Sequence, residues 1–323
     1  MERSHFGSFL CIIALSFLCS CGTRNGNSAG ESGGRRSFPS PQAPVMLTDP
    51  AEVLAWTTTH FWDRFTDTVQ VYACDSAFVN GVSLDDLESQ MGLFATLAGQ
   101  VSPSDGAAAV SRLFDRIAVF AGKYPDSNVF SEMCRLTAHY LYDPNSPVRS
   151  EDLYLPFVER LGQSDLLDSM SRARHQWEAE MCRLNRTGTP ATDFSFTDTR
   201  GRVRTLYGVD ADYTVLIFAN PGCRACQEIT AAMGASPEIS SLIQSGRVKV
   251  VDVYIDQEIE DWKAHIADYP PDWINGYDQD FAIRTDRLYH VRAIPSIYLL
   301  DKNKSVLMKD APQEKMLEAL ATL

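Results

Sequence analysis

The chain has 323 residues, of which 45% are hydrophobic and 22% charged, and this globular composition excludes collagen, coiled coil and disorder throughout the chain. At roughly 100–200 residues per domain, the length predicts about two domains. The formal net charge of −13 disfavours binding to nucleic acids or to anionic membrane surfaces, because both kinds of binding depend on Lys and Arg.

Residues 1–20 have the pattern of a signal peptide. Their apolar run, residues 9–18, is shorter than a membrane-spanning helix, which needs about 20 residues. The run leads into Leu18-Cys19-Ser20-Cys21, which resembles the lipobox of bacterial lipoproteins. The resemblance implies lipid attachment at Cys21 and a protein anchored in the bacterial cell envelope, facing the periplasm. Ordinary cleavage nearby, with Cys21 incidental, is the alternative.

Residues 21–44 are rich in Gly, Ser, Asn and Pro and contain almost no large apolar side chain. A segment of this kind does not bury enough surface to fold, so we expect a flexible tether. Processing at Cys21 would leave five other cysteines outside the cytoplasm, where disulfides persist. An odd number leaves at least one thiol unpaired unless a partner supplies another. The five are Cys74, Cys134, Cys182, Cys223 and Cys226.

Residues 45–186 have a helical pattern, which predicts a bundle or array of about six helices. Two helix starts are marked by capping residues, Asp49 before Pro50 and Ser83 before Leu84. The expected helices cover residues 50–69, 83–98, 108–124, 126–140, 151–161 and 165–184.

This helical half carries no chemical motif. Its three histidines are isolated, whereas a zinc site needs three or four ligands, so we expect ordinary core or surface residues. Its three cysteines lie in apolar helical stretches and are expected to pack as small hydrophobic side chains, with a disulfide between two of them as the alternative. The histidines are His60, His139 and His175.

From residue 187 the hydrophobic period changes, and strands alternate with helices as in a mixed α/β sheet. A hairpin signal at Asp198-Thr199-Arg200-Gly201 joins two short strands. Continuous apolar runs at 213–219 and 248–255 predict strands that are covered on both faces. Helices are expected at 223–233, 238–244, 258–268, 281–288 and 314–320, a second hairpin at 296–308, and an irregular stretch around Pro270-Pro271.

The chemistry is concentrated where the first of these strands ends, at Cys223-Arg224-Ala225-Cys226. At a helix N-terminus, free backbone N–H groups and the helix dipole favour the thiolate of the first cysteine. Arg224 adds positive charge beside it, and the second thiol, one turn later, can close on the first and release a substrate. A redox dithiol is therefore favoured over a buried inert pair and over a zinc site, which would need two further ligands.

Three pieces resemble the thioredoxin superfamily, most closely the membrane-tethered TlpA- and ResA-like thioredoxins of bacterial envelopes. The first runs from Val215 to Cys226, the second, from Tyr289 to Asp301, contains Ile294-Pro295, and the third is the hairpin and helix that follow. The resemblance implies a thioredoxin fold for residues 187–323, a cis-proline at Pro295 and substrate alignment by Pro295 and the Ile294 backbone. Residues 45–186 resemble, more weakly, uncharacterised helical domains that precede thioredoxin modules in envelope lipoproteins.

The sequence departs from the family's pattern around the dithiol. Gly222 stands where the family usually has Trp, and Ile217 stands where thioredoxins have a buried Asp. ResA-like proteins carry a Glu three residues after the second cysteine, whereas Glu228 follows Cys226 by two. The proton acceptor for the second thiol therefore stays open, and the candidates are Glu228, Asp252 and Asp256.

Together these features predict a lipid-anchored, periplasm-facing thiol–disulfide oxidoreductase. Cys223 is expected to attack and Cys226 to resolve, with protein thiols or disulfides as substrates, an upstream redox partner, and no metal or organic cofactor. The alternative is a binding or scaffold lipoprotein whose helical half captures a partner, with a dithiol that is vestigial or only redox-responsive. The missing Trp and acid keep this alternative open.

Overall fold

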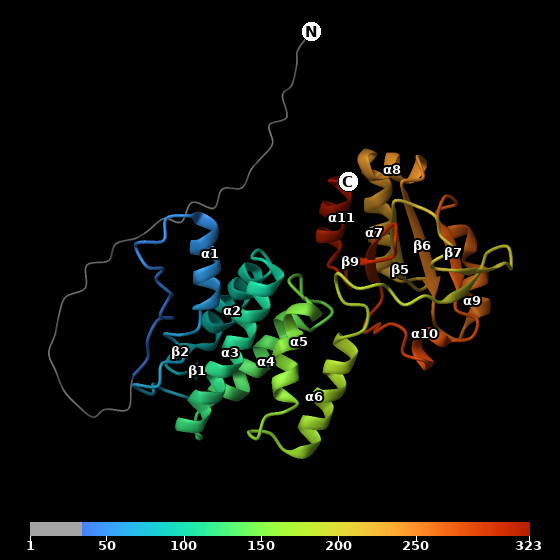
Figure 1. Ribbon diagram of the computed structural model, residues 1–323. Helices are drawn as coiled ribbons and strands as arrows, with labels where there is room; N and C mark the ends of the chain where they lie inside the picture. Colours follow the sequence, from blue (N-terminus) through green and yellow to red (C-terminus); the bar gives the residue numbers. More distant parts are fainter. Residues whose placement is uncertain (1–33) are drawn as a thin grey trace, which may run out of the picture. The chain divides into compact units, whose positions relative to one another are not determined.

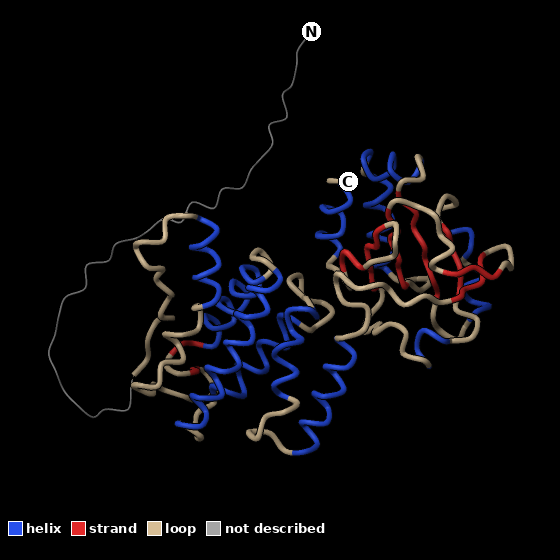
Figure 2. Tube along the Cα trace, viewed as in Figure 1, coloured by secondary structure: helices blue, strands red, loops and turns tan. Residues whose placement is uncertain are grey.

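A helical region is followed by an α/β region in residues 34–323, which are the residues that the computed structural model describes (Figure 1). Figure 2 shows that the strands are concentrated in the second region. The expected signal peptide, Cys21 and the first part of the expected tether lie outside these residues. None of the described helices has the length and apolar composition needed to cross a membrane.

Between residues 34 and 186, six α-helices and one short hairpin form the helical region. Two helices begin as predicted, because Asp49 Oδ1 accepts from the Ala51 and Glu52 N–H groups, and Ser83 Oγ accepts from the Asp86 N–H. The helices are α1 (Pro50–Thr59), α2 (Leu84–Ala98), α3 (Pro103–Lys123), α4 (Val129–Leu141), α5 (Glu151–Leu161) and α6 (Ser169–Cys182).

Two features of this region differ from the expectation of helices alone. Helix α1 ends at Thr59, well before residue 69, and the apolar pattern continues because the following turns bury Phe61 and Phe65. Strands β1 (Phe78–Val79) and β2 (Val82–Ser83) form an unexpected hairpin. Its turn, Asn80-Gly81, has φ values of +46° and +81°, the conformation that Asn-Gly favours in two-residue hairpins.

The chain before α1 packs on the helical region. Phe38 is buried, and its ring centroid lies 5.5 Å from that of Phe61. Arg36 donates to the carbonyl oxygens of Asn80 and Phe65 over 2.9 and 3.0 Å. The expectation of a flexible tether up to residue 44 is therefore wrong for this part of the chain, because Phe38 and Arg36 hold it on the helical region.

A seven-stranded mixed sheet, in the order β4-β3-β7-β6-β5-β8-β9, forms the centre of the α/β region. β5 pairs in parallel with β6 on one side and antiparallel with β8 on the other. The strands are β3 (Ser195–Asp198), β4 (Val203–Thr205), β5 (Tyr213–Phe218), β6 (Val248–Tyr254), β7 (Ile274–Tyr277), β8 (Ser296–Asp301) and β9 (Val306–Met308). The helices are α7 (Arg224–Ala235), α8 (Pro237–Gln244), α9 (Ile259–Ala264), α10 (Ala282–Thr285) and α11 (Gln313–Ala321), with a 3-10 turn at Ile266–Asp268.

Helices α7, α8 and α11 cover one face of this sheet, through Ile229, Ile239 and Met316 among others. The expected mixed α/β sheet is confirmed, whereas β7 lies in a stretch that was expected to be irregular. Both regions belong to one compact unit. The switch from a helical to an α/β pattern near residue 186 therefore separates two kinds of structure within that unit. The layering places the start of α7 at the end of the central strand β5.

Candidate functional site

The dithiol lies at the junction of β5 and α7. After β5 the chain turns through Asn220-Pro221-Gly222, and Gly222 has a φ of +72°, in the left-handed region that favours glycine. The family that the sequence resembles usually has Trp at this position. Gly222 stands there instead, because the backbone conformation of this turn favours glycine. Cys223 follows as the N-cap of α7.

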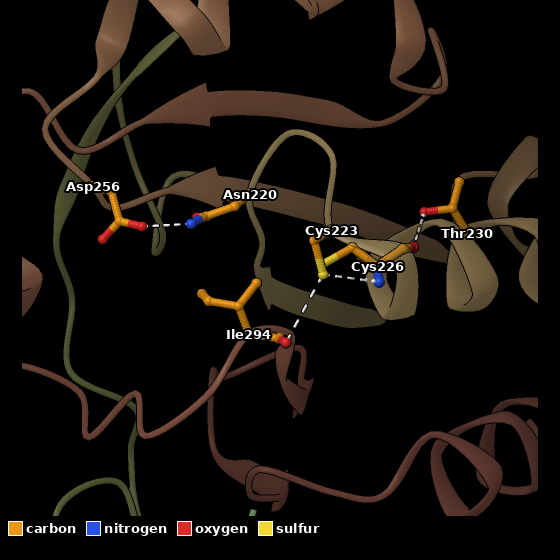
Figure 3. The surroundings of a disulfide bond; sticks show 6 residues. All are labelled: Asn220, Cys223, Cys226, Thr230, Asp256 and Ile294. Carbon is orange, nitrogen blue, oxygen red and sulfur yellow. Dashed lines mark hydrogen bonds between the residues drawn. A yellow bond between two sulfur atoms is a disulfide. The ribbon is translucent and has the colours of Figure 1, made fainter. Parts of the chain in front are cut away.

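Cys223 and Cys226 form a disulfide, with their Cα atoms 5.3 Å apart (Figure 3). Cys223 is partly exposed, whereas Cys226 is buried. The Cys226 N–H donates to Cys223 Sγ over 3.2 Å. Because an N–H donor at the start of a helix stabilises negative charge, the geometry favours Cys223 as the accessible thiolate once the pair is reduced.

The second predicted segment reaches the same site from the start of β8. The Ile294–Pro295 bond is cis, as the resemblance implied. The Ile294 carbonyl oxygen lies 3.8 Å from Cys223 Sγ (Figure 3). Ser296, the first residue of β8, pairs with Phe218, the last residue of β5. The sheet register therefore brings two groups that are 71 positions apart in the chain to one place.

Asp310 holds both flanks of this cis bond. Arg292 Nη2 lies 2.8 Å from Asp310 Oδ2, and the Ser296 hydroxyl donates to Asp310 Oδ1 over 2.8 Å. Asp310 is buried. Asp310 could not be predicted from the sequence, because the residue follows β9 and no spacing motif connects it with the loop that it holds.

Arg224 and Glu228 pair with each other on the surface of α7. Their side chains are 90% and 54% exposed, and Arg224 Nε lies 2.8 Å from Glu228 Oε1. The carboxylate balances the guanidinium charge, so the helix N-terminus is the main local feature that favours a Cys223 thiolate. This pairing argues against the expected role of Arg224 in tuning Cys223 and of Glu228 as proton acceptor.

Asp252, another candidate acceptor, is buried on β6. It lines a cavity of about 250 Å³ that Cys226 also lines. Among the residues that the structure describes, Asp252 Oδ1 has no hydrogen-bond partner. Burial raises the pKa of Asp252 to about 7. A carboxyl group with this pKa can exchange protons near neutral pH.

Asp256, the third candidate, is bound on both of its oxygens. Asn220 Nδ2 donates to Asp256 Oδ2 (Figure 3), and Arg284 Nη2 lies 2.8 Å from Asp256 Oδ1. These contacts fix the turn between β5 and the dithiol. Asp252 is therefore the candidate that combines a free carboxylate oxygen with a place in the Cys226 cavity.

The other described cysteines, Cys74, Cys134 and Cys182, are free thiols. Burial raises the pKa of Cys134 to about 12, and burial also raises the pKa of Cys182. A thiol that stays protonated is a poor nucleophile, so these two side chains act as packing groups. The cysteines of the helical region thus match the expectation of unpaired, structural residues.

The isolated histidines contact carboxylates that are close to them in the chain. His60 Nδ1 lies 2.7 Å from Asp63, and His175 Nδ1 lies 3.0 Å from Glu178. Within residues 34–323, no three or more His, Cys, Asp or Glu side chains are grouped so that they could hold a metal ion.

The sequence was compared with protein families and with curated proteins. Residues 20–185 match the family described as a domain of unknown function (DUF5106). A comparison with curated proteins gives no match.

Among solved structures, the chain is similar to a thioredoxin-like protein from Bacteroides caccae, with 33% identity and a TM-score of 0.76, over 89% of this chain and 99% of that one. The C-terminal domain of an uncharacterized protein from Bacteroides fragilis is 45% identical, with a TM-score of 0.41, over 42% of this chain and 98% of that one. A domain of a possible thiol-disulfide isomerase from Cytophaga hutchinsonii is 24% identical, with a TM-score of 0.37, over 43% and 94%. The first similarity extends over both the helical and the α/β regions.

Proposed function

The chain belongs to the thioredoxin-like family of the Bacteroides caccae protein and, over residues 20–185, to the DUF5106 family, and on this basis we propose that it is a thiol–disulfide oxidoreductase acting on protein substrates. The observation that carries the proposal is the Cys223–Cys226 disulfide at the start of α7, with the Ile294 carbonyl oxygen 3.8 Å from Cys223 Sγ. A partly exposed sulfur beside a backbone acceptor suits exchange with a disulfide in an extended polypeptide.

The proposed exchange has two steps. In the reducing direction, the Cys223 thiolate attacks one sulfur of a substrate disulfide, forms a mixed disulfide and releases the other substrate sulfur as a thiolate. The Cys226 thiolate then attacks Cys223 Sγ, forms the Cys223–Cys226 disulfide and releases the second substrate sulfur. Two electrons pass from the dithiol to the substrate, and an upstream redox partner restores the dithiol. The oxidising direction runs the same steps in reverse.

Asp252 is proposed to accept the proton that the Cys226 thiol loses before it attacks. Both residues line the cavity of about 250 Å³. The burial that raises the pKa of Asp252 to about 7 brings its proton affinity closer to that of a thiol, so transfer costs less free energy than it would to an ordinary carboxylate. The cavity has room for water, which can carry the proton if the two side chains do not touch.

Ile294 and Pro295 are proposed to align the substrate. The Ile294 carbonyl oxygen is a backbone acceptor beside the sulfur that would be attacked. An extended substrate segment can donate an N–H to it, as in the addition of a strand to a sheet edge. Pro295 has no N–H of its own, so it offers no competing donor.

The lipobox-like sequence supports a further part of the proposal, which is that a lipid on Cys21 anchors the protein in the bacterial cell envelope, facing the periplasm. This is the arrangement of the TlpA- and ResA-like thioredoxins that the sequence resembles. A compartment outside the cytoplasm also suits a protein that exchanges disulfides, because disulfides persist there.

Catalysed exchange tests the proposed function. The purified protein is mixed with dithiothreitol and a peptide that carries one disulfide, and the appearance of peptide thiols is followed. The reverse reaction uses the reduced peptide and oxidised glutathione. We expect acceleration in at least one direction, its loss in Cys223→Ser, and its retention in Cys74→Ser, a control outside the site. A binding protein with an inert dithiol would accelerate neither reaction, and that result would overturn the proposal.

A further inference from the structure

Buried charges join the helical region to the loop that precedes β8. Glu151, the first residue of α5, is 3% exposed. Its Oε1 lies 2.8 Å from Arg292 Nε and 3.3 Å from His290 Nδ1, and its Oε2 lies 2.7 Å from Lys309 Nζ. Two of these three partners, His290 and Arg292, belong to the loop that leads to Pro295.

Arg292 is held by more than Glu151. Its Nη2 lies 2.8 Å from Asp310 Oδ2, and its guanidinium carbon lies 4.4 Å from the ring centroid of Tyr142, which the helical region supplies. Arg149, also from the helical region, donates to the backbone carbonyl oxygen of Asp310 over 3.0 Å. The helical region therefore holds the loop directly through Glu151 and indirectly through Asp310.

Burial makes the positions of these charged groups interdependent. Burial opposes ionisation of Glu151, but its contacts with His290, Lys309 and Arg292 lower its pKa to about 2, so it stays ionised. When one member of a buried ion network is removed, the charges that remain lose their compensation and rearrange. Because Arg292 lies two residues before Ile294, a shift of Arg292 would displace the carbonyl oxygen beside Cys223.

We propose that Glu151 is a positioning residue for exchange with protein substrates, which it supports by fixing, through Arg292, the loop that presents the Ile294 carbonyl. The inference rests on the function proposed above and extends it to the helical region. An extended polypeptide uses the Ile294 backbone, whereas a small dithiol needs only the Cys223 sulfur. Loss of the Glu151 charge is therefore expected to affect the first class of substrate and to spare the second.

Glu151→Gln tests this by keeping the size of the side chain while removing its charge. Exchange of the full chain is measured with a disulfide-bonded peptide and with reduced dithiothreitol, a small dithiol that reduces the Cys223–Cys226 disulfide. We expect a several-fold lower kcat/KM for the peptide, mainly through a higher KM, and an unchanged rate with dithiothreitol. Asp198→Asn is the matched control, because Asp198 is also buried and pairs with Arg202 over 2.8 Å, in the hairpin of β3 and β4. It should change neither rate.

Arg292→Lys is the second variant, and it carries the test if Glu151→Gln does not fold. Lysine lacks the planar fork with which Arg292 contacts Glu151 through Nε and Asp310 through Nη2, so the same separation of substrates is expected. If the wild type exchanges with the peptide and the folded variants keep its kcat/KM, the positioning role is overturned and the proposed function stands. Equal losses with both substrates also overturn the positioning role. Absence of exchange in the wild type overturns the proposed function itself.

Discussion

Ile217 of β5 and Asp252 of β6 are register partners in the parallel part of the sheet. Ile217 occupies the position, six residues before Cys223, at which thioredoxins carry a buried acid. In this chain the buried carboxyl group lies on the neighbouring strand and lines the cavity beside Cys226. The buried acid that is absent at position 217 therefore has a spatial counterpart in Asp252, 35 positions further along the chain (217 to 252).

Asp252→Asn should change how stability depends on pH. The folded-state pKa of about 7 lies above the ordinary value of 3.8, so the folded protein keeps a proton that the unfolded chain releases. Stability from this group is full below about pH 4 and falls as pH rises to about 7, by roughly 4 kcal/mol in total. In Asp252→Asn this fall should disappear, and the oxidised variant should be more stable than wild type at pH 8. Urea unfolding from pH 5 to pH 8 measures it, and an unchanged pH dependence in the variant would count against a buried, protonated Asp252.

The Cys223 thiol should titrate below the free-thiol value of about 8.5, because the start of α7 stabilises its thiolate. Alkylation rate against pH reports this in a reduced variant that lacks Cys74, Cys134 and Cys182. Arg224→Gln should move the inflection little, since Arg224 is 90% exposed and already paired with Glu228. An inflection at or above about 8.5 would contradict an activated nucleophile.

Gly106→Ala should destabilise the helical region. A Cβ at this position of α3 would lie 2.5 Å from the Ala98 carbonyl oxygen and 2.8 Å from Leu153 Cδ2, so the backbone would have to move, at a cost of about 1–3 kcal/mol. Gly122→Ala, near the end of the same helix, meets nothing within 4 Å and should be neutral or stabilising by up to about 1 kcal/mol. Urea unfolding of both variants measures the change in the free energy of unfolding. Equal changes in the two variants would show that close packing at Gly106 does not contribute to stability.

Lipid attachment at Cys21 should make the mature protein partition into the detergent phase after extraction. Cys21→Ala should leave an uncleaved precursor or release a soluble form, because the acceptor for the lipid is gone. Cell fractionation followed by detergent phase separation measures this, and Cys19→Ala is the control on the same segment. A Cys21→Ala protein that is processed normally and still extracts with membranes would exclude the lipoprotein interpretation.

The fold could be predicted where local chemistry decides it. Asp49 and Ser83 begin helices as expected, since capping depends on a few neighbouring residues. Strand β7 could not be predicted, because Ile274–Tyr277 has a single β-branched residue and contains Asn and Gly, which are rare in strands. The segment is a strand because it pairs with β3 on one side and β6 on the other. Its packing against β3 is close, since a Cβ on Gly276 would lie 2.6 Å from Phe196 Cδ2.

Some residues of the candidate site could be predicted from the sequence, and others depend on the fold. Cys223, Cys226 and Pro295 stand in short motifs that can be recognised along the chain, and the structure brings them together. The choice of Asp252 among the acids depends on burial and strand register, which the sequence does not contain. Glu151 and Asp310 contact Arg292 only because three distant segments pack together, so no spacing rule could have found them.

Trapping of mixed disulfides distinguishes the roles of Cys223 and Cys226. Reduced Cys226→Ala keeps the attacking Cys223 and lacks the resolving thiol, so with a disulfide-bonded peptide it should accumulate a covalent adduct on Cys223, detected by mass spectrometry without reductant. Reduced Cys223→Ala should trap little, because Cys226 is 8% exposed. Abundant adduct in the first variant and little in the second is the predicted result. Equal trapping by both variants, or none by either, would contradict the assignment of Cys223 as nucleophile and Cys226 as resolving cysteine.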